Sequence, residues 1–250
     1  MIKYGNLNLQ TDNIITESVQ HSQMADRIIN SYPISRRSGN KFINDEFGTK
    51  TISIKGIIIS PSASGLQGIK DVMQKELSIP EQQLTIDTGR VYYATCSKAD
   101  FPELRYTQSA QPFELEFFSS SPYSYGSTLT AGFVIGSGIQ STLITTTISG
   151  SANIEPQITL SYSGINTISR ISLYHLEKGS NVTISGSFLS GTETVLNYEN
   201  ATVNNSGILS DYTGQFSKWD SGVNNLTIEL EGKTDFKING DITYTPRFYH

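Results

Sequence analysis

The sequence predicts a mainly β protein of two domains, in which an N-terminal β-domain covered by one α-helix is followed by a C-terminal β-sandwich. Three observations predict this class. Runs of β-branched and aromatic residues are bounded by Gly, Pro, Asn and Asp. A single stretch has helical periodicity, and at about residue 126 the composition changes to Gly, Ser and Thr. A length of 250 residues allows one large β-domain or two modest ones, and the change in pattern favours two.

The helical pattern falls at residues 66–77. Apolar side chains recur there with the helical period, at Leu66, Ile69, Val72, Met73 and Leu77. Ser64 followed by Gln67 fits a capping box, and Pro80 prevents the helix from continuing. Because an isolated helix of this length is marginally stable in water, we expect it to lie on the face of a sheet.

The strands around this helix complete a domain over residues 1–125. They are expected, in order, at TISIKGIII, QLTI, GRVYYATC and PFELEFFSSSPYSYG. Residues 1–47 alternate more weakly and carry three basic residues, Arg36, Arg37 and Lys41. This trio belongs either to a solvated loop or to a contact with an acidic neighbour, and the sequence leaves both interpretations open.

The second half of the chain differs in composition and in strand length. Residues 126–150 are rich in Gly, Ser and Thr and are interpreted as a junction. The stretch from Gly126 to Asn153 contains no charged residue, which suggests partial burial between domains or subunits. Residues 151–250 form short β-patterns with Gly, Asn and Ser turns and no helical period, which predicts a β-sandwich. The last run, FKINGDITYTPRFY, is expected to pair within that sandwich.

Charge and hydropathy argue against nucleic-acid binding and against membrane insertion. The formal net charge is −5 and the sequence pI is about 5.2, so the chain has no general attraction for nucleic acid or anionic lipid. We therefore expect no sequence-specific nucleic-acid binding. The sequence contains no apolar run long enough to span a bilayer, and its N-terminal residues lack the features of a signal peptide. We expect no membrane insertion and synthesis in the cytoplasm.

The sequence contains no recognisable catalytic or metal-binding motif. His21, His175 and His250 are scattered and do not show metal-ligand spacing, and His175 is expected to be a polar surface group. The single cysteine, Cys96, offers neither a disulfide nor a cysteine metal site. Motifs for a nucleophilic serine or a phosphate-binding loop are also missing. We therefore predict no enzymatic activity, no catalytic residue, no metal and no cofactor.

Binding of a host glycan is the alternative to a purely structural role. A β-sandwich that exposes Trp219 and Tyr212 could stack these rings against a sugar. A lone tryptophan near Gly and Asp more often packs the edge of a sandwich. Trp219 and Tyr212 are the candidate glycan contacts.

The order of motifs along the chain resembles a known family. ISIKGIII precedes the helix and is followed by QLTI, GRVYYATC and FELEFFSSSPY. The second half contains EPQITLSY, VTISGSF, TVLNYENATVNNSG and DSGVNNLTIEL. In this order the motifs resemble the distal tail protein of siphovirus-type bacteriophages, whose second domain is a galectin-like or carbohydrate-module-like sandwich. Tyr198 departs from the pattern, because relatives often have Asp there.

The resemblance implies a structural virion protein located in the phage tail. It implies a homo-oligomer, a ring of six copies, at the distal end of the tail tube. Its partners would be the tail tube protein, the tail-tip hub protein and receptor-binding or fibre proteins. Arg36, Arg37 and Lys41 would then be ring-interface contacts. The sequence decides neither between six-fold and three-fold symmetry nor whether the sandwich binds sugar or only protein.

Overall fold

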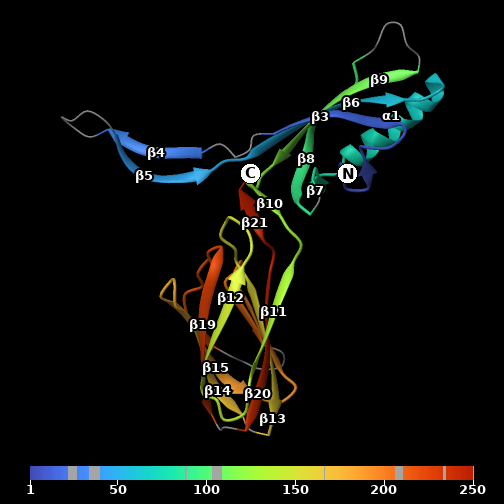
Figure 1. Ribbon diagram of the computed structural model, residues 1–250. Helices are drawn as coiled ribbons and strands as arrows, with labels where there is room; N and C mark the ends of the chain where they lie inside the picture. The colour runs from blue at the N-terminus through green and yellow to red at the C-terminus, as the bar shows by residue number, and fades with distance from the viewer. Residues whose placement is uncertain are drawn as a thin grey trace. The chain divides into compact units, whose positions relative to one another are not determined.

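The computed structural model describes residues 1–21, 27–33, 40–87, 89–102, 109–165, 167–205, 211–232 and 235–249 (Figure 1). The chain divides into two compact units. Unit 1 consists of Met1–Gly126 and Phe248–His250, and unit 2 consists of Ser127–Arg247. Unit 1 is therefore built from two separate segments of the chain.

Among the described residues, unit 1 contains a nine-stranded sheet and a separate two-stranded hairpin. In sheet order the main strands are β2 (Leu7–Asn8), β1 (Lys3–Tyr4), β7 (Gln82–Thr85), β8 (Val91–Asp100), β9 (Ala110–Ser119), β6 (Lys50–Ile59) and β3 (Ile14–His21). Beside this path, β10 (Tyr123–Tyr125) pairs with β8 and with β21 (Arg247–Tyr249). The hairpin consists of β4 (Arg27–Pro33) and β5 (Asn40–Phe47), which pair with each other.

Strict alternation along the central strands creates the core of unit 1. Successive side chains of a strand point to opposite faces, so Ile52 and Ile54 of β6 point to the same face and are both buried. Ile52 lies opposite Phe117 of β9, and Ile54 lies opposite Leu115. These residues belong to the same apolar cluster as the buried residues of the helix.

The helix α1 spans Ala63–Leu77 and starts before the predicted residue 66. Its N-cap is Ser62, whose hydroxyl accepts a hydrogen bond from the N–H of Gly65 at 3.2 Å. The predicted cap, Ser64, lies inside the first turn, so that assignment is wrong. The buried side chains of the helix are Leu66, Met73 and Leu77. Val72, predicted for the same stripe, lies on its flank and is 57% exposed.

Unit 2 is a sandwich of two five-stranded antiparallel sheets. In the first sheet the order is β11 (Leu129–Ile135), β20 (Phe236–Tyr244), β13 (Gln157–Gly164), β16 (Glu193–Asn197) and β17 (Thr202–Asn205). In the second sheet it is β12 (Ser141–Ile148), β19 (Gly222–Gly232), β14 (Ile168–His175), β15 (Ser180–Phe188) and β18 (Asp211–Gly214). Buried residues from both sheets join in one apolar core, as the layer architecture requires.

Two expectations about the second half need correction. In place of the predicted junction, residues 126–150 hold β11 and β12, and Ile135 and Ile148 of these strands are buried in the sandwich core. The Gly and Ser residues between them supply the turn rather than a linker. The C-terminal run pairs within the sandwich only along β20, because β21 pairs with β10 of unit 1.

Candidate interaction surfaces

The β4–β5 hairpin, whose strands are labelled in Figure 1, belongs to unit 1. It exposes large apolar side chains. Ile28 is 54% exposed, Ile29 is 61% exposed and Ile43 is 60% exposed. Ile28 and Ile29 are consecutive residues of β4 and therefore point to opposite faces of the ribbon. Asn30 pairs with Asn44 but Ser31 pairs with Phe42, which leaves Ile43 as the extra residue of a β-bulge. Both faces of the hairpin thus carry an apolar side chain.

Aromatic rings hold the base of this hairpin within unit 1. Phe47, the last residue of β5, lies 4.8 Å from Tyr249 between ring centroids. Tyr249 in turn lies 5.2 Å from Tyr123 in an edge-to-face arrangement. The guanidinium of Arg27 lies over the Phe47 ring, 6.0 Å from its centroid. The hairpin is therefore anchored at its base, whereas its exposed isoleucines lie further along the ribbon.

The predicted basic contacts lie on or beside the same hairpin. Arg36 and Arg37 fall outside the described residues. Lys41 lies in β5, where its backbone is opposite Tyr32, and its side chain is outside the description. Their role as contacts to an acidic neighbour stays a prediction. Sequence analysis did not single out the hairpin isoleucines, although the runs RIINSYP and NKFINDEF place apolar residues among polar ones on two neighbouring segments.

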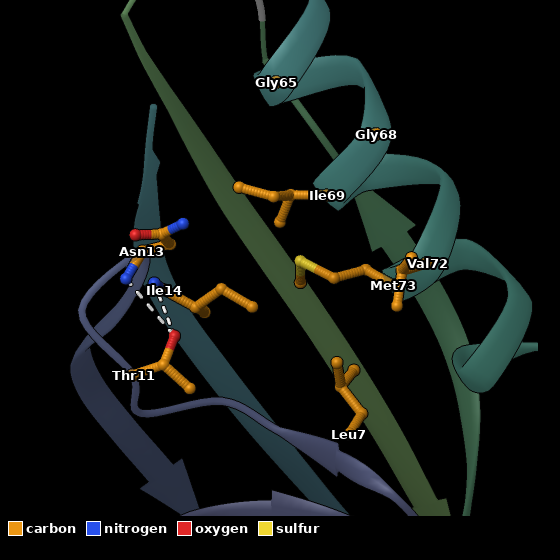
Figure 2. Close-up of a pocket in the computed structure, with 9 residues that line it drawn as sticks. All are labelled: Leu7, Thr11, Asn13, Ile14, Gly65, Gly68, Ile69, Val72 and Met73. Carbon is orange, nitrogen blue, oxygen red and sulfur yellow. Dashed lines mark hydrogen bonds between the residues drawn. The ribbon is translucent and has the colours of Figure 1, made fainter. Parts of the chain in front are cut away.

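A groove of about 430 Å³ lies beside α1 in unit 1 (Figure 2). Its apolar lining comes from Leu7, Ile14, Ile69, Val72 and Met73. Ile69 and Met73 point from the helix toward the side of the groove that carries Ile14 and Leu7. A Cβ at Gly68 would meet nothing within 4 Å, so the helix leaves open space at this point. The hydroxyl of Thr11 accepts hydrogen bonds from the backbone N–H groups of Asn13 and Ile14. The groove offers no acid or base, and its chemistry suits an apolar side chain of a partner.

The candidate glycan contacts are not both on the surface. Trp219 is fully buried in the sandwich core, and its indole ring stacks on His175 with centroids 4.8 Å apart. The prediction that it stacks on a sugar is therefore wrong, because a buried ring presents no face to a ligand. Tyr212 is 44% exposed, and its hydroxyl donates a hydrogen bond to the carbonyl of Ala201. One exposed tyrosine alone does not make a stacking platform.

His175 is buried rather than on the surface, because it shares the inward face of β14 with Ile171 and Leu173. Its Nε2 lies 3.0 Å from Oδ1 of Asn224, so Nε2–H donates there and Nδ1 accepts from the hydroxyl of Ser217 at 3.1 Å. The Nδ2 group of Asn224 donates to two backbone carbonyls, which fixes the orientation of its amide. Burial lowers the pKa of His175, and the neutral ring fits this pattern of donors and acceptors.

This network ties the segment around Trp219 to the sandwich. Ser217 is itself hydrogen-bonded to the hydroxyl of Ser180 at 2.6 Å, so β15, β14 and the segment before β19 are joined by one chain of polar contacts. The serine and histidine resemble a nucleophile and base, but the imidazole is 2% exposed. The arrangement therefore serves to satisfy buried polar groups.

Two further kinds of site were sought in the part of the chain that the structure describes. No group of three or more His, Cys, Asp or Glu residues there is placed to hold a metal ion. None of the helical structure described reaches the length and hydropathy needed to cross a bilayer.

Several solved structures have a fold similar to that of this chain, among them structures from two phages. The crystal structure of the Dit protein (gp 19.1) of SPP1, a paradigm of the hub adsorption apparatus in phages that infect Gram-positive bacteria, matches with a TM-score of 0.75 and 14% identity. That match covers 99% of this chain and 98% of the Dit chain. A chain of the phage P2 baseplate, in its activated conformation with Ca, matches with a TM-score of 0.50 and 7% identity, over 94% of this chain and 92% of that chain. No protein-family model matches the sequence, and neither does any curated protein. The chain thus has the fold of a phage distal tail protein along nearly its whole length.

Proposed function

We propose that this chain is a non-enzymatic structural subunit of a phage tail, in which six copies form a closed ring at the hub. The likeness in fold to the SPP1 Dit protein over 99% of the chain supports a hub role. The observation that carries the ring itself is the β4–β5 hairpin, with Ile28, Ile29 and Ile43 exposed on a ribbon whose strands pair, among the described residues, only with each other.

A two-stranded ribbon of this kind needs a partner. Isolated hairpins are marginally stable in water, and exposed apolar residues concentrated on one element are typical of interaction sites. Covering the exposed part of each isoleucine contributes about 1 to 2 kcal/mol. If every copy offers one hairpin and receives one, the contact is heterologous, and rotation of successive copies closes it into a ring.

In a phage tail, the proposed ring would contact several other tail proteins. Its two faces would contact the tail tube protein and the tail-tip hub protein, and unit 2 would contact receptor-binding or fibre proteins. The apolar groove beside α1 is a second surface that such contacts can use. Arg36, Arg37 and Lys41 would add ionic contacts to an acidic neighbouring copy.

The test measures the mass and shape of the full-length protein, by light scattering with negative-stain imaging. The informative variant is Ile29→Asp, which places a charge where the residue is 61% exposed on the hairpin. The matched control is Leu189→Asp in unit 2, where the leucine is 50% exposed. We expect closed rings from the wild type and the control, and an association at least about tenfold weaker for Ile29→Asp, because a buried unpaired carboxylate costs more than about 1.4 kcal/mol.

Two results would contradict the proposal. A wild-type protein that stays monomeric at high concentration, and that also fails to bind the end of a tail tube, would exclude a ring subunit. Rings formed equally well by Ile29→Asp would show that the hairpin is not the contact between copies.

A further inference from the structure

The two lateral sides of the sandwich in unit 2 have edge strands of different length. The edge strands of the first sheet are β11 and β17, and those of the second are β12 and β18. β11 and β12 lie against each other and form one side of the sandwich. They contain seven and eight residues, whereas β17 and β18 contain four each. One side of the sandwich therefore presents long strand edges and the other presents short ones.

The side of the sandwich formed by β11 and β12 lacks the features that usually prevent an edge strand from pairing with another chain. Free strand edges offer unpaired N–H and C=O groups, and proteins commonly guard them with Lys, Pro, bulges or a covering segment. The sequence from 126 to 153 contains no charged residue and no proline. The pairings of β11 with β20 and of β12 with β19 run without a bulge. No strand in the described ranges pairs with the outer edge of β11 or β12. On the side formed by β17 and β18, by comparison, β18 begins with the charged Asp211.

Side chains along this edge are also incompletely covered. Val134 of β11 is 58% exposed and Leu143 of β12 is 59% exposed. On the opposite face of β11, Ala131 and Phe133 pack against the sandwich core but are only partly buried. A strand added beside β11 would pair its free main-chain groups and cover the open flank of Phe133 and Val134.

We propose that the β11 edge binds an extended segment of another tail protein that carries no acidic residue, and that this segment adds to the first sheet as a sixth strand. This inference rests on the proposed function. In a closed ring, copies are related by rotation, so the same edge of two copies does not meet itself. The described part of the opposite edge strand, β17, has four residues and does not match the seven of β11. β11 itself carries no charged side chain, but the exposed carboxylate of Asp241 on β20 lies over Gly132, where an added Cβ would be 3.2 Å from its Oδ1. An acidic side chain of the added segment beside Gly132 would be repelled by this carboxylate.

The experiment compares amide hydrogen exchange of the full-length chain in the isolated ring and in tails purified from virions. We expect the amides of residues 129–135 that point away from β20 to exchange at least about tenfold more slowly in tails, because the others are already paired with β20 and edge pairing removes the access of these amides to water. The amides of residues 211–214, on the other lateral side, should exchange at the same rate in both states.

A matched pair of variants separates edge pairing from a general effect of charge. Thr130→Lys places a lysine on β11, and Thr213→Lys places one on β18, and both threonines are exposed. Both variants should form rings as the wild type does. Tails carrying Thr130→Lys should lose the protection of residues 129–135, whereas tails carrying Thr213→Lys should keep it.

The possible results distinguish edge pairing by another protein, edge pairing by a second copy of this chain, and failure of the ring itself. Rings without slower exchange at residues 129–135 in tails would overturn this inference and leave the ring intact. Full protection of these amides already in the isolated ring would also overturn it, by making a second copy the occupant. A chain that forms no ring either in isolation or on a tail would contradict the proposed function, and slower exchange of residues 129–135 on a tail would still support edge pairing.

Discussion

At the scale of single residues, the buried imidazole of His175 links the stability of the fold to pH. Its two ring nitrogens are fully used by Ser217 and Asn224 when the ring is neutral. Protonation would turn Nδ1 from an acceptor into a donor and would place a charge in the core beside Trp219. The charged groups that face the ring are Glu177, with Oε2 3.4 Å from Nε2, and Lys178 and Asp220. Burial outweighs the two carboxylates, and the pKa of His175 is lowered.

This shift predicts that the protein loses stability as the pH falls below neutrality. The unfolded chain takes up the proton near pH 6.5, whereas the folded chain resists it to a lower pH. The free energy of unfolding should therefore fall from about pH 6.5 down to the folded pKa, with a slope of at most about 1.4 kcal/mol per pH unit for one proton. Below the folded pKa this contribution should level off.

Urea unfolding at pH 7.5 and at pH 5.5 in wild type and in His175→Gln checks this prediction. The variant should be less stable at pH 7.5 but should lose less stability between the two pH values. Desolvation opposes ionisation of Glu177, but hydrogen bonds from its own backbone and from the backbone and side chain of Asn225, together with His175, lower its pKa overall. Glu177 therefore stays ionised between pH 5.5 and pH 7.5 and does not contribute to the difference. Equal losses in the two proteins would show that His175 does not carry the dependence.

The burial of His175 and of Trp219 did not follow from the sequence analysis. His175 follows Ile171 and Leu173 at spacings of two, so strand alternation alone could have placed it inside. Its polarity suggested the surface, and the buried partners that satisfy it come from distant segments. Trp219 belongs to no clear strand pattern, and its burial could not be predicted from its neighbours in the sequence.

At the scale of elements, the start of α1 depends on which of two nearby serine hydroxyls caps the helix. Two serines near the start, Ser62 and Ser64, are both acceptable N-caps by residue type. In the structure only Ser62 accepts a hydrogen bond from a backbone N–H of the first turn, that of Gly65. Ser62 also has extended backbone angles, with φ −145° and ψ 153°, as an N-cap requires.

The two serines should therefore differ in their effect on stability. Ser62→Ala should lower the free energy of unfolding by about 1 kcal/mol, because one backbone donor loses its acceptor. Ser64→Ala should change it by less than about 0.5 kcal/mol, because this residue lies within the exposed first turn. Thermal or urea unfolding measures both. An equal loss in the two variants would contradict Ser62 as the cap.

The elements themselves were largely predictable, and their ends were not. Periodicity located the helix and its buried Leu66, Met73 and Leu77, and β-branched runs located the strands beside it. The cap was misplaced because the capping-box spacing fits Ser64 and Gln67 by chance. The Gly- and Thr-rich composition of residues 126–150 predicts a junction, because uncharged edge strands and linkers share this composition.

At the scale of the whole molecule, a change in composition marks where the chain leaves unit 1, but nothing in the sequence marks where it returns. Unit 1 ends at Gly126 and resumes at Phe248. The return depends on pairing between β10 and β21, which are short and far apart in the sequence. Such long-range pairing has no local signal, which is why the last strand was expected within the sandwich.

The final residues should therefore stabilise the N-terminal unit rather than the sandwich. Phe248 lies under the guanidinium of Arg90, 4.0 Å from the ring centroid, and Tyr249 contacts Phe47 and Tyr123. Replacing both residues, Phe248→Ala with Tyr249→Ala, should destabilise unit 1 by about 1.5 to 4.5 kcal/mol, since these three ring contacts are each worth about 0.5 to 1.5 kcal/mol. Amide exchange should become faster in β10 and at the base of the hairpin, and should stay unchanged in β13 and β14. Tyr212→Ala, which alters an exposed ring of unit 2, is the control and should leave exchange in unit 1 as it was. Faster exchange confined to the sandwich of the double variant would show that the C-terminal strand supports unit 2 instead.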